Sequence, residues 1–123
     1  MDQLILHMVG DYVTQTHWMA QNKARVTYVA AIHALVYSIP FLLIGSAQAV
    51  GVVLLSHFLI DRFSLAKYVV YAKNRITDPA LSWKDASGTG YHKDVPAWLS
   101  VWLLIAADNT IHLACNFMAL RYM

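Results

Sequence analysis

The sequence predicts an all-α fold, a small polytopic membrane protein of about four helices in a bundle, with three or four of them spanning the bilayer. Hydrophobic residues make up 59% of the 123 residues and charged residues only 13%, a composition too apolar for an ordinary soluble domain. Apolar segments with helical spacing alternate with short polar stretches. At this length, we expect one membrane domain over residues 1–123.

The first two expected helices cover residues 2–21 and 26–44. The first has helical periodicity but carries too many polar side chains to face lipid, so we expect it to pack against the other helices. The second is almost free of charge, and at about 1.5 Å per residue its length approaches the ~30 Å bilayer core. Pro40 should kink its last turns.

The second half of the chain predicts two further helices. Helical periodicity continues from residue 47 through residue 75, which favours one long helix whose polar end leaves the membrane. Residues 76–95 are rich in Pro, Gly, Ser and charge and are expected to form an exposed polar loop. Pro96 then starts a last helix, with Trp98 and Trp102 suited to a membrane interface.

The charge pattern bounds the partners and the orientation. The net charge is only +2 and the basic residues are scattered, so nucleic acid is not expected as a partner. Basic residues follow the first helix at Lys23 and Arg25 and cluster again between Arg62 and Arg75, ends that four antiparallel helices would put on the same side. By the positive-inside rule, this side is cytoplasmic.

Every aspartate within an apolar helix has a histidine four residues away. The pairs are His7 with Asp11, His57 with Asp61, and Asp108 with His112, and a further histidine, His33, lies in the second helix. Positions i and i+4 share one helix face about a turn apart, so each pair can converge on one point. We therefore expect three His–Asp pairs that can each chelate a metal ion, with His33 completing the ring of ligands.

A metal centre is the interpretation that these seven residues favour. An ionised aspartate in a membrane helix costs ~2.5 to 3.5 kcal/mol, and protein cations within the apolar segments are scarce. One or two divalent ions (Zn, Mn or Fe) would supply the missing charge, because imidazole and carboxylate suit these metals. One pair by itself usually forms a local hydrogen bond, and a proton path or a packing network is the alternative for the whole set.

The chain resembles a family of small phage and bacterial membrane proteins of unknown function. The resemblance lies in "HMVGDYVTQTHWMAQNK", "IHALVYSIPF", "LLSHFLIDRFSLAKYVVYAKNR" and "PAWLSVWLLIAADNTIHLACN". The matching positions are His7, Asp11, Gln15, Trp18, His33, Tyr37, His57, Asp61, Arg62, Asp108, Asn109 and His112. More distantly, the pattern looks like metal-dependent hydrolases of the bacterial inner membrane associated with the SOS response. The resemblance implies a multi-pass protein of that membrane, in a bacterial or phage genome.

The expected function is hydrolysis of a phosphoester or related bond in a membrane lipid or lipid-linked substrate. We expect Asp61 and Asp108 to act in catalysis, with Arg62 holding a phosphate at the interface. One alternative is a proton or cation conduit formed by a homo-oligomer, since four helices are too few for a monomeric transporter. Another is a non-enzymatic phage effector that binds a host membrane protein.

Overall fold

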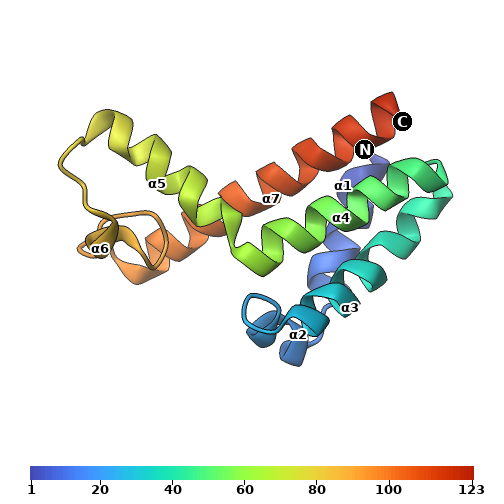
Figure 1. The fold of residues 1–123 in the computed structure, drawn as a ribbon, viewed down its shortest axis with the longest axis horizontal. Coiled ribbons are helices and arrows are strands. Elements are labelled where there is room, and N and C mark those ends of the chain that lie inside the picture. The colour runs from blue at the N-terminus through green and yellow to red at the C-terminus, as the bar shows by residue number, and fades with distance from the viewer. The chain divides into compact units, whose positions relative to one another are not determined.

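The computed structural model describes all 123 residues as helices and their connections, without a strand (Figure 1). This confirms the all-α class. The elements are α1 (Asp2–Met8), the π-helix η1 (Val9–Val13), α2 (His17–Asn22), α3 (Thr27–Ser38), the 3-10 helix η2 (Ile39–Leu43), α4 (Ala47–Phe63), α5 (Leu65–Thr77), α6 (Trp83–Ala86) and α7 (Ala97–Tyr122). The chain forms two compact units, residues 1–63 with 112–123 (unit 1) and residues 64–111 (unit 2).

The helix expected over residues 2–21 is interrupted. It widens into the π-helix η1 and stops at Thr14 before α2 begins. Two polar side chains satisfy the carbonyl groups left open at this end, because Thr14 Oγ1 donates to Gly10 O at 3.0 Å and Gln15 Nε2 donates to Asp11 O at 3.1 Å. Thr16 then caps α2 by accepting from the backbone N–H of Met19.

The helix expected over residues 26–44 changes character at Pro40. The α-helical part, α3, ends at Ser38, and residues 39–43 continue as the tighter 3-10 helix η2. Proline lacks the N–H that an α-helix would use, so the last turns adopt another hydrogen-bonding pattern. Gly45 and Ser46 then turn the chain into α4.

The prediction of one long helix over residues 47–75 is wrong. Ser64 has left-handed backbone angles, φ 49° and ψ 48°, and separates α4 from α5. A left-handed residue cannot continue a right-handed helix. The apolar spacing persists on both sides of Ser64, which is why the periodicity gave no sign of the break.

These interruptions change the membrane prediction. Only α7, at 26 residues, is long and apolar enough to cross a bilayer by itself, and α4 with α5 passes the same criterion only if the two count as one broken span. A bilayer needs about 20 apolar residues in one helix. The three or four spanning helices expected from the sequence are therefore not supported.

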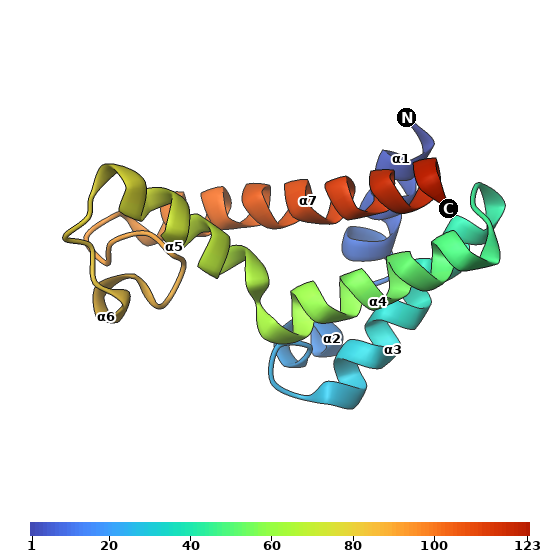
Figure 2. The same cartoon turned by 45° about the horizontal axis from the view of Figure 1, so that its top comes forward.

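Unit 1 is built on the pairing of α3 with α4, which lie side by side in both views (Figures 1 and 2). Its core contains aromatic and aliphatic side chains from α3, η2, α4 and the C-terminal part of α7. They are Tyr37, Phe41, Val50, Val53 and Ala119. Both chain termini lie at one end of this unit, where Ser46 Oγ donates to Met123 O at 3.3 Å.

Unit 2 contains α5, α6 and the first part of α7. Trp83 of α6 stacks on Tyr68 of α5 with 4.9 Å between ring centroids. Within the segment expected as an exposed loop, Lys93 Nζ lies 2.7 Å from Asp85 Oδ1. The hydrogen bond between them lowers the pKa of the Asp85 carboxyl. Gly90, with φ 84°, packs its backbone directly on α5.

Replacing Gly90 with alanine is expected to destabilise unit 2 by about 1–3 kcal/mol. A Cβ there would lie 2.5 Å from Lys67 O and 2.8 Å from Tyr71 N, both backbone atoms that cannot rotate away. Gly88→Ala is the control, because no atom lies within 4 Å of its Cβ position. Thermal unfolding of the two variants would contradict this expectation if both melted at the same temperature.

Candidate metal centre

Four elements of unit 1 bring buried ligand-type side chains together. Asp11 comes from η1, His33 from α3, and His57 and Asp61 from successive turns of α4, while His112 comes from α7. All five are buried, the two aspartates at 8% and 6% exposure and the three histidines at 1% or less. Carboxylates are rarely buried to this degree unless a cation or hydrogen bonds compensate them.

Two imidazole nitrogens of this cluster lie close to each other, and each aspartate places one carboxylate oxygen near both of them. His33 Nε2 and His57 Nε2 lie 2.9 Å apart. Asp11 Oδ1 is 3.2 and 3.4 Å from these two nitrogens, and Asp61 Oδ2 is 3.2 and 3.0 Å from them. Metal–ligand bonds of ~2.0 to 2.1 Å give ligand–ligand edges of roughly 2.9 to 3.4 Å. Each carboxylate oxygen therefore forms, with the two nitrogens, a set of three atoms whose spacing fits the ligands of a divalent ion.

The hydrogen bonding of these atoms also favours a cation. Asp11 Oδ1 and Asp61 Oδ2 are buried without a hydrogen bond of good geometry, and the Lys23 ammonium lies beside Asp61 only, so the two carboxylates together are costly to bury. Only one hydrogen fits between His33 Nε2 and His57 Nε2, so at least one nitrogen presents a lone pair. A divalent ion would bind this nitrogen together with a carboxylate oxygen.

A second, overlapping group of possible ligands consists of His57, Asp61 and His112. His112 Nε2 lies 3.5 Å from Asp61 Oδ1, and the rings of His57 and His112 are 4.2 Å apart. Both groups need His57, which favours one ion over the two that the sequence allowed.

Tyr37 positions the cluster from α3. Its ring stacks on His57 with 3.6 Å between centroids, and its hydroxyl accepts a hydrogen bond from Asn116 Nδ2 at 2.7 Å. The hydroxyl hydrogen can then serve His7 Nδ1, which lies 2.8 Å from it and 3.5 Å from Asp11 Oδ2. The Nδ1 atom of His57 has no hydrogen-bond partner, so stacking on Tyr37 holds this imidazole instead.

Lys23 and Arg62 occupy the rim of the cluster. Lys23 Nζ lies 2.9 Å from Asp61 Oδ2 and 3.5 Å from His33 Nε2. Arg62 donates from Nε to Thr27 Oγ1 at 3.1 Å and from a terminal nitrogen to Ala24 O at 3.0 Å. In these contacts, Arg62 fastens the turn that follows Lys23 to the end of α4.

A family model described as "Protein of unknown function (DUF3307)" matches residues 1–119. The chain belongs to this family. The match includes every predicted ligand, so the centre lies within the DUF3307 domain. No curated protein and no solved structure matches the chain. The distant resemblance to inner-membrane hydrolases thus stays an expectation.

The seven ligands predicted for this DUF3307 chain fall into three classes in the structure. Five lie in the two overlapping groups, namely Asp11, His33, His57, Asp61 and His112. His7 is in neither group, but its Nδ1 lies 3.5 Å from Asp11 Oδ2 and is hydrogen-bonded to the Tyr37 hydroxyl. Asp108 lies one turn before His112 in α7, in the part of that helix that belongs to unit 2, and is in neither group.

Neither Lys23 nor Tyr37 was predicted to take part in the centre. Tyr37 lies four residues after His33, the same spacing that revealed the His–Asp pairs, so extending that search to aromatic residues would have found it. Lys23 served only as evidence for membrane orientation. Its contact with Asp61 depends on the turn between α2 and α3, which no helical periodicity describes.

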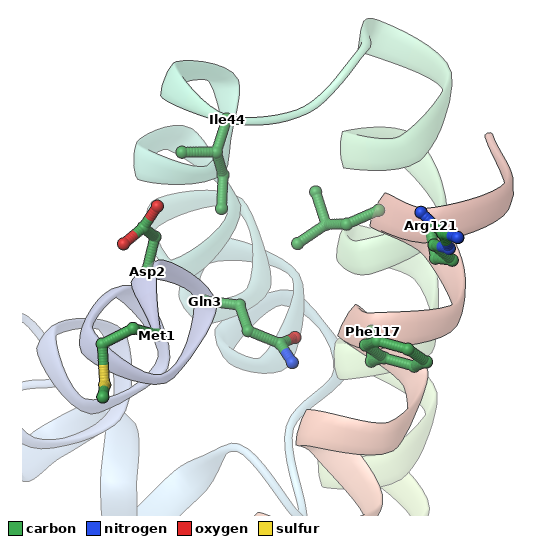
Figure 3. A pocket seen from close by; sticks show the side chains of 7 residues that line it. Met1, Asp2, Gln3, Ile44, Phe117 and Arg121 are labelled. Atoms are coloured by element: carbon green, nitrogen blue, oxygen red, sulfur yellow. The ribbon is translucent and has the colours of Figure 1, made fainter.

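A separate pocket lies at the terminal end of unit 1. Figure 3 shows Asp2 and Gln3 of α1 on one side and Phe117 and Arg121 of α7 on the other. None of the predicted ligands lines this pocket. The candidate site is therefore the buried cluster.

Proposed function

We propose that this DUF3307 chain is a membrane-associated, metal-dependent hydrolase that cleaves a phosphoester or related bond of a lipid or lipid-linked substrate. The observation that carries the proposal is a pair of buried imidazole nitrogens 2.9 Å apart, with one oxygen of Asp11 and one of Asp61 each lying 3.0 to 3.4 Å from both nitrogens. Such a gathering of ligand-type atoms is more than a packing network needs, since Asp11 Oδ1 accepts no hydrogen bond of good geometry.

The ligands of the ion would come from the two overlapping groups, Asp11 with His33 and His57, or His57 with Asp61 and His112. This nitrogen and oxygen donor set suits Zn²⁺, Mn²⁺ or Fe²⁺. When bound, such an ion supplies Lewis-acid activation of water and of a phosphoryl oxygen. The buried residues around the ion would keep water away from it on the protein side. They also fix the orientation of the imidazoles, chiefly through the stacking of Tyr37 on His57.

Two features support association with a membrane and, with it, a lipid-linked substrate. The helix α7 meets the length and apolarity of a membrane span, and only 17% of its apolar window is buried, unlike the core helix of a compact domain. Unit 1 also exposes large apolar side chains near its terminal end, among them Leu42 at 58% and Leu43 at 82% exposure. A substrate with an apolar tail would share this environment.

Metal analysis of detergent-purified protein tests the centre. We expect about one transition-metal ion per chain in the native protein and none in a His57→Ala, Asp61→Ala double variant, because two ligands are lost. The chain offers a matched control, His92→Ala with Asp94→Ala, which removes an exposed histidine–aspartate contact of 3.2 Å in unit 2. Metal-free native protein with its full helical content would overturn the proposal.

Product release tests the hydrolysis. Metal-loaded protein is incubated with a phosphatidic acid or a polyprenyl phosphate in mixed micelles, and inorganic phosphate is measured. We expect release by the native protein and by the His92, Asp94 control, but not by the His57, Asp61 variant. Ion flux across proteoliposomes without any product would favour the conduit instead.

A further inference from the structure

We propose that Lys23 competes with the metal ion for Asp61 and, once displaced, binds the anionic phosphate group of the substrate. This inference rests on the proposed function and gives its substrate a stated charge. Lys23 has no part in the ligand set, and its role follows from its contacts, its exposure and the charges around it.

Lys23 and a metal ion need the same oxygen atom. Lys23 Nζ lies 2.9 Å from Asp61 Oδ2, the atom that also lies 3.2 Å from His33 Nε2 and 3.0 Å from His57 Nε2. Lys23 Nζ is itself 3.5 Å from His33 Nε2. A divalent ion bonded to this oxygen and this nitrogen would be within ~4 Å of the ammonium, where two cations repel strongly. Binding of the metal therefore displaces the lysine.

The charges of the cluster lead to the same conclusion. Asp11 and Asp61 carry two negative charges, and Lys23 is the only permanent cation in contact with either of them. One ammonium leaves the pair with a net negative charge, whereas one divalent ion neutralises both carboxylates. With the metal bound, the lysine charge is in excess and needs an anion as a new partner.

Lys23 can move because its backbone is fixed and its side chain reaches solvent. Its side chain is 19% exposed, whereas those of the ligands it contacts are at 3% or below. Its N–H donates to Met19 O at 2.9 Å at the end of α2, and Arg62 fastens the following residue, Ala24, to α4. The backbone of Lys23 is therefore held in place, while its flexible side chain can move the ammonium at the solvent-exposed side of the centre.

An anion approaching the metal from this side meets the displaced ammonium first. Lysine pairs with phosphate as a strongly hydrated point charge with three donors. A phosphate oxygen bound to Lys23 replaces the carboxylate contact that the lysine has lost. The same chemistry is offered by free phosphate and by a lipid headgroup, and the experiment below separates these two sources.

Zinc titration of Lys23→Met and wild-type protein tests the competition. We expect zinc to bind the variant about tenfold more tightly, since the repelling ammonium is gone. Lys84→Met is the control, because Lys84 is exposed in α6 and should leave the zinc affinity unchanged. Thermal unfolding gives a second measure, in which zinc should raise the melting temperature of Lys23→Met more than that of the wild type.

Phosphate binding to the zinc-loaded proteins tests the second role of Lys23. We expect the affinity to fall about tenfold in Lys23→Met and to be retained in Lys23→Arg, which keeps the charge. The measurement is made with inorganic phosphate and, separately, with vesicles containing phosphatidic acid against neutral vesicles. A loss seen only with the vesicles identifies a lipid phosphate, and a loss seen only with inorganic phosphate identifies a free one.

The outcomes separate this inference from the proposed function. Equal zinc affinity in the wild type and Lys23→Met overturns the competition while leaving the metal centre intact. Phosphate and vesicle binding unaffected by Lys23→Met overturns the anion role. Absence of zinc binding in both proteins removes the metal centre and this inference together.

Discussion

Replacing Tyr37 with alanine is expected to lower the free energy of unfolding by about 3–5 kcal/mol, the usual cost of removing a buried aromatic ring. Tyr37 is fully buried, stacks on His57 and belongs to the core of unit 1 together with Phe41. Its loss would leave a cavity at the junction of α1, α3, α4 and α7. The measurement is equilibrium unfolding of detergent-purified protein, followed by circular dichroism.

Tyr37→Phe separates the hydroxyl from the ring. The ring remains stacked on His57, but Asn116 Nδ2 loses this acceptor and His7 Nδ1 loses its contact with the hydroxyl. We expect a smaller loss of about 1–3 kcal/mol for the unsatisfied buried groups, and a metal affinity reduced about 10- to 100-fold if the network orients the ligands. Unfolding free energies equal to that of the wild type in both variants would contradict the role given to Tyr37.

Much of the candidate centre could be predicted because helix geometry alone brings i and i+4 side chains together. His57 and Asp61 lie within one regular α-helix, and their side chains meet at 3.0 Å as the spacing requires. His7 and Asp11 have the same spacing, but η1 begins between them and their closest atoms are 3.5 Å apart. Sequence spacing thus describes a pair well only where the helix between its members is regular.

The features that escaped prediction all depend on breaks in regular structure. Ser64 ends α4 with left-handed backbone angles although serine seldom adopts them. Lys23 reaches Asp61 through the turn between α2 and α3, and Arg62, expected to hold a phosphate, fastens that turn to α4. Periodicity predicts the face of a helix on which a residue lies, but it does not predict where the helix ends or which direction the chain then follows.

The number of membrane spans was overestimated for a similar reason. The composition indicated several spans because it reflects the apolar content of the chain. It contains no information on the helix breaks that limit the length of each span. In the structure, the helices before α7 are divided near Thr14, Ile39 and Ser64, and each piece is shorter than a bilayer requires. The apolar content that suggested extra spans belongs partly to the core around Tyr37 and Phe41.

Replacing Gly10 with alanine is expected to destabilise unit 1 by about 1–3 kcal/mol and to weaken metal binding. A Cβ at Gly10 would lie 2.9 Å from Tyr37 Cε2 and still closer to Cδ2. The ring cannot yield, because it is fully buried and stacked on His57. The strain would fall on η1, whose next residue is Asp11, and would move this carboxylate relative to His33.

Gly51→Ala provides the matched control. Gly51 lies inside α4, is exposed and has no atom within 4 Å of its Cβ position, so alanine there should stabilise the protein by about 0.4–1 kcal/mol through the unfolded state. Melting temperature and zinc affinity are measured for both variants. A Gly10→Ala protein as stable as Gly51→Ala would contradict the close packing of η1 on α3. A destabilised Gly10→Ala protein with unchanged zinc affinity would show that Asp11 does not depend on that packing for its place among the ligands.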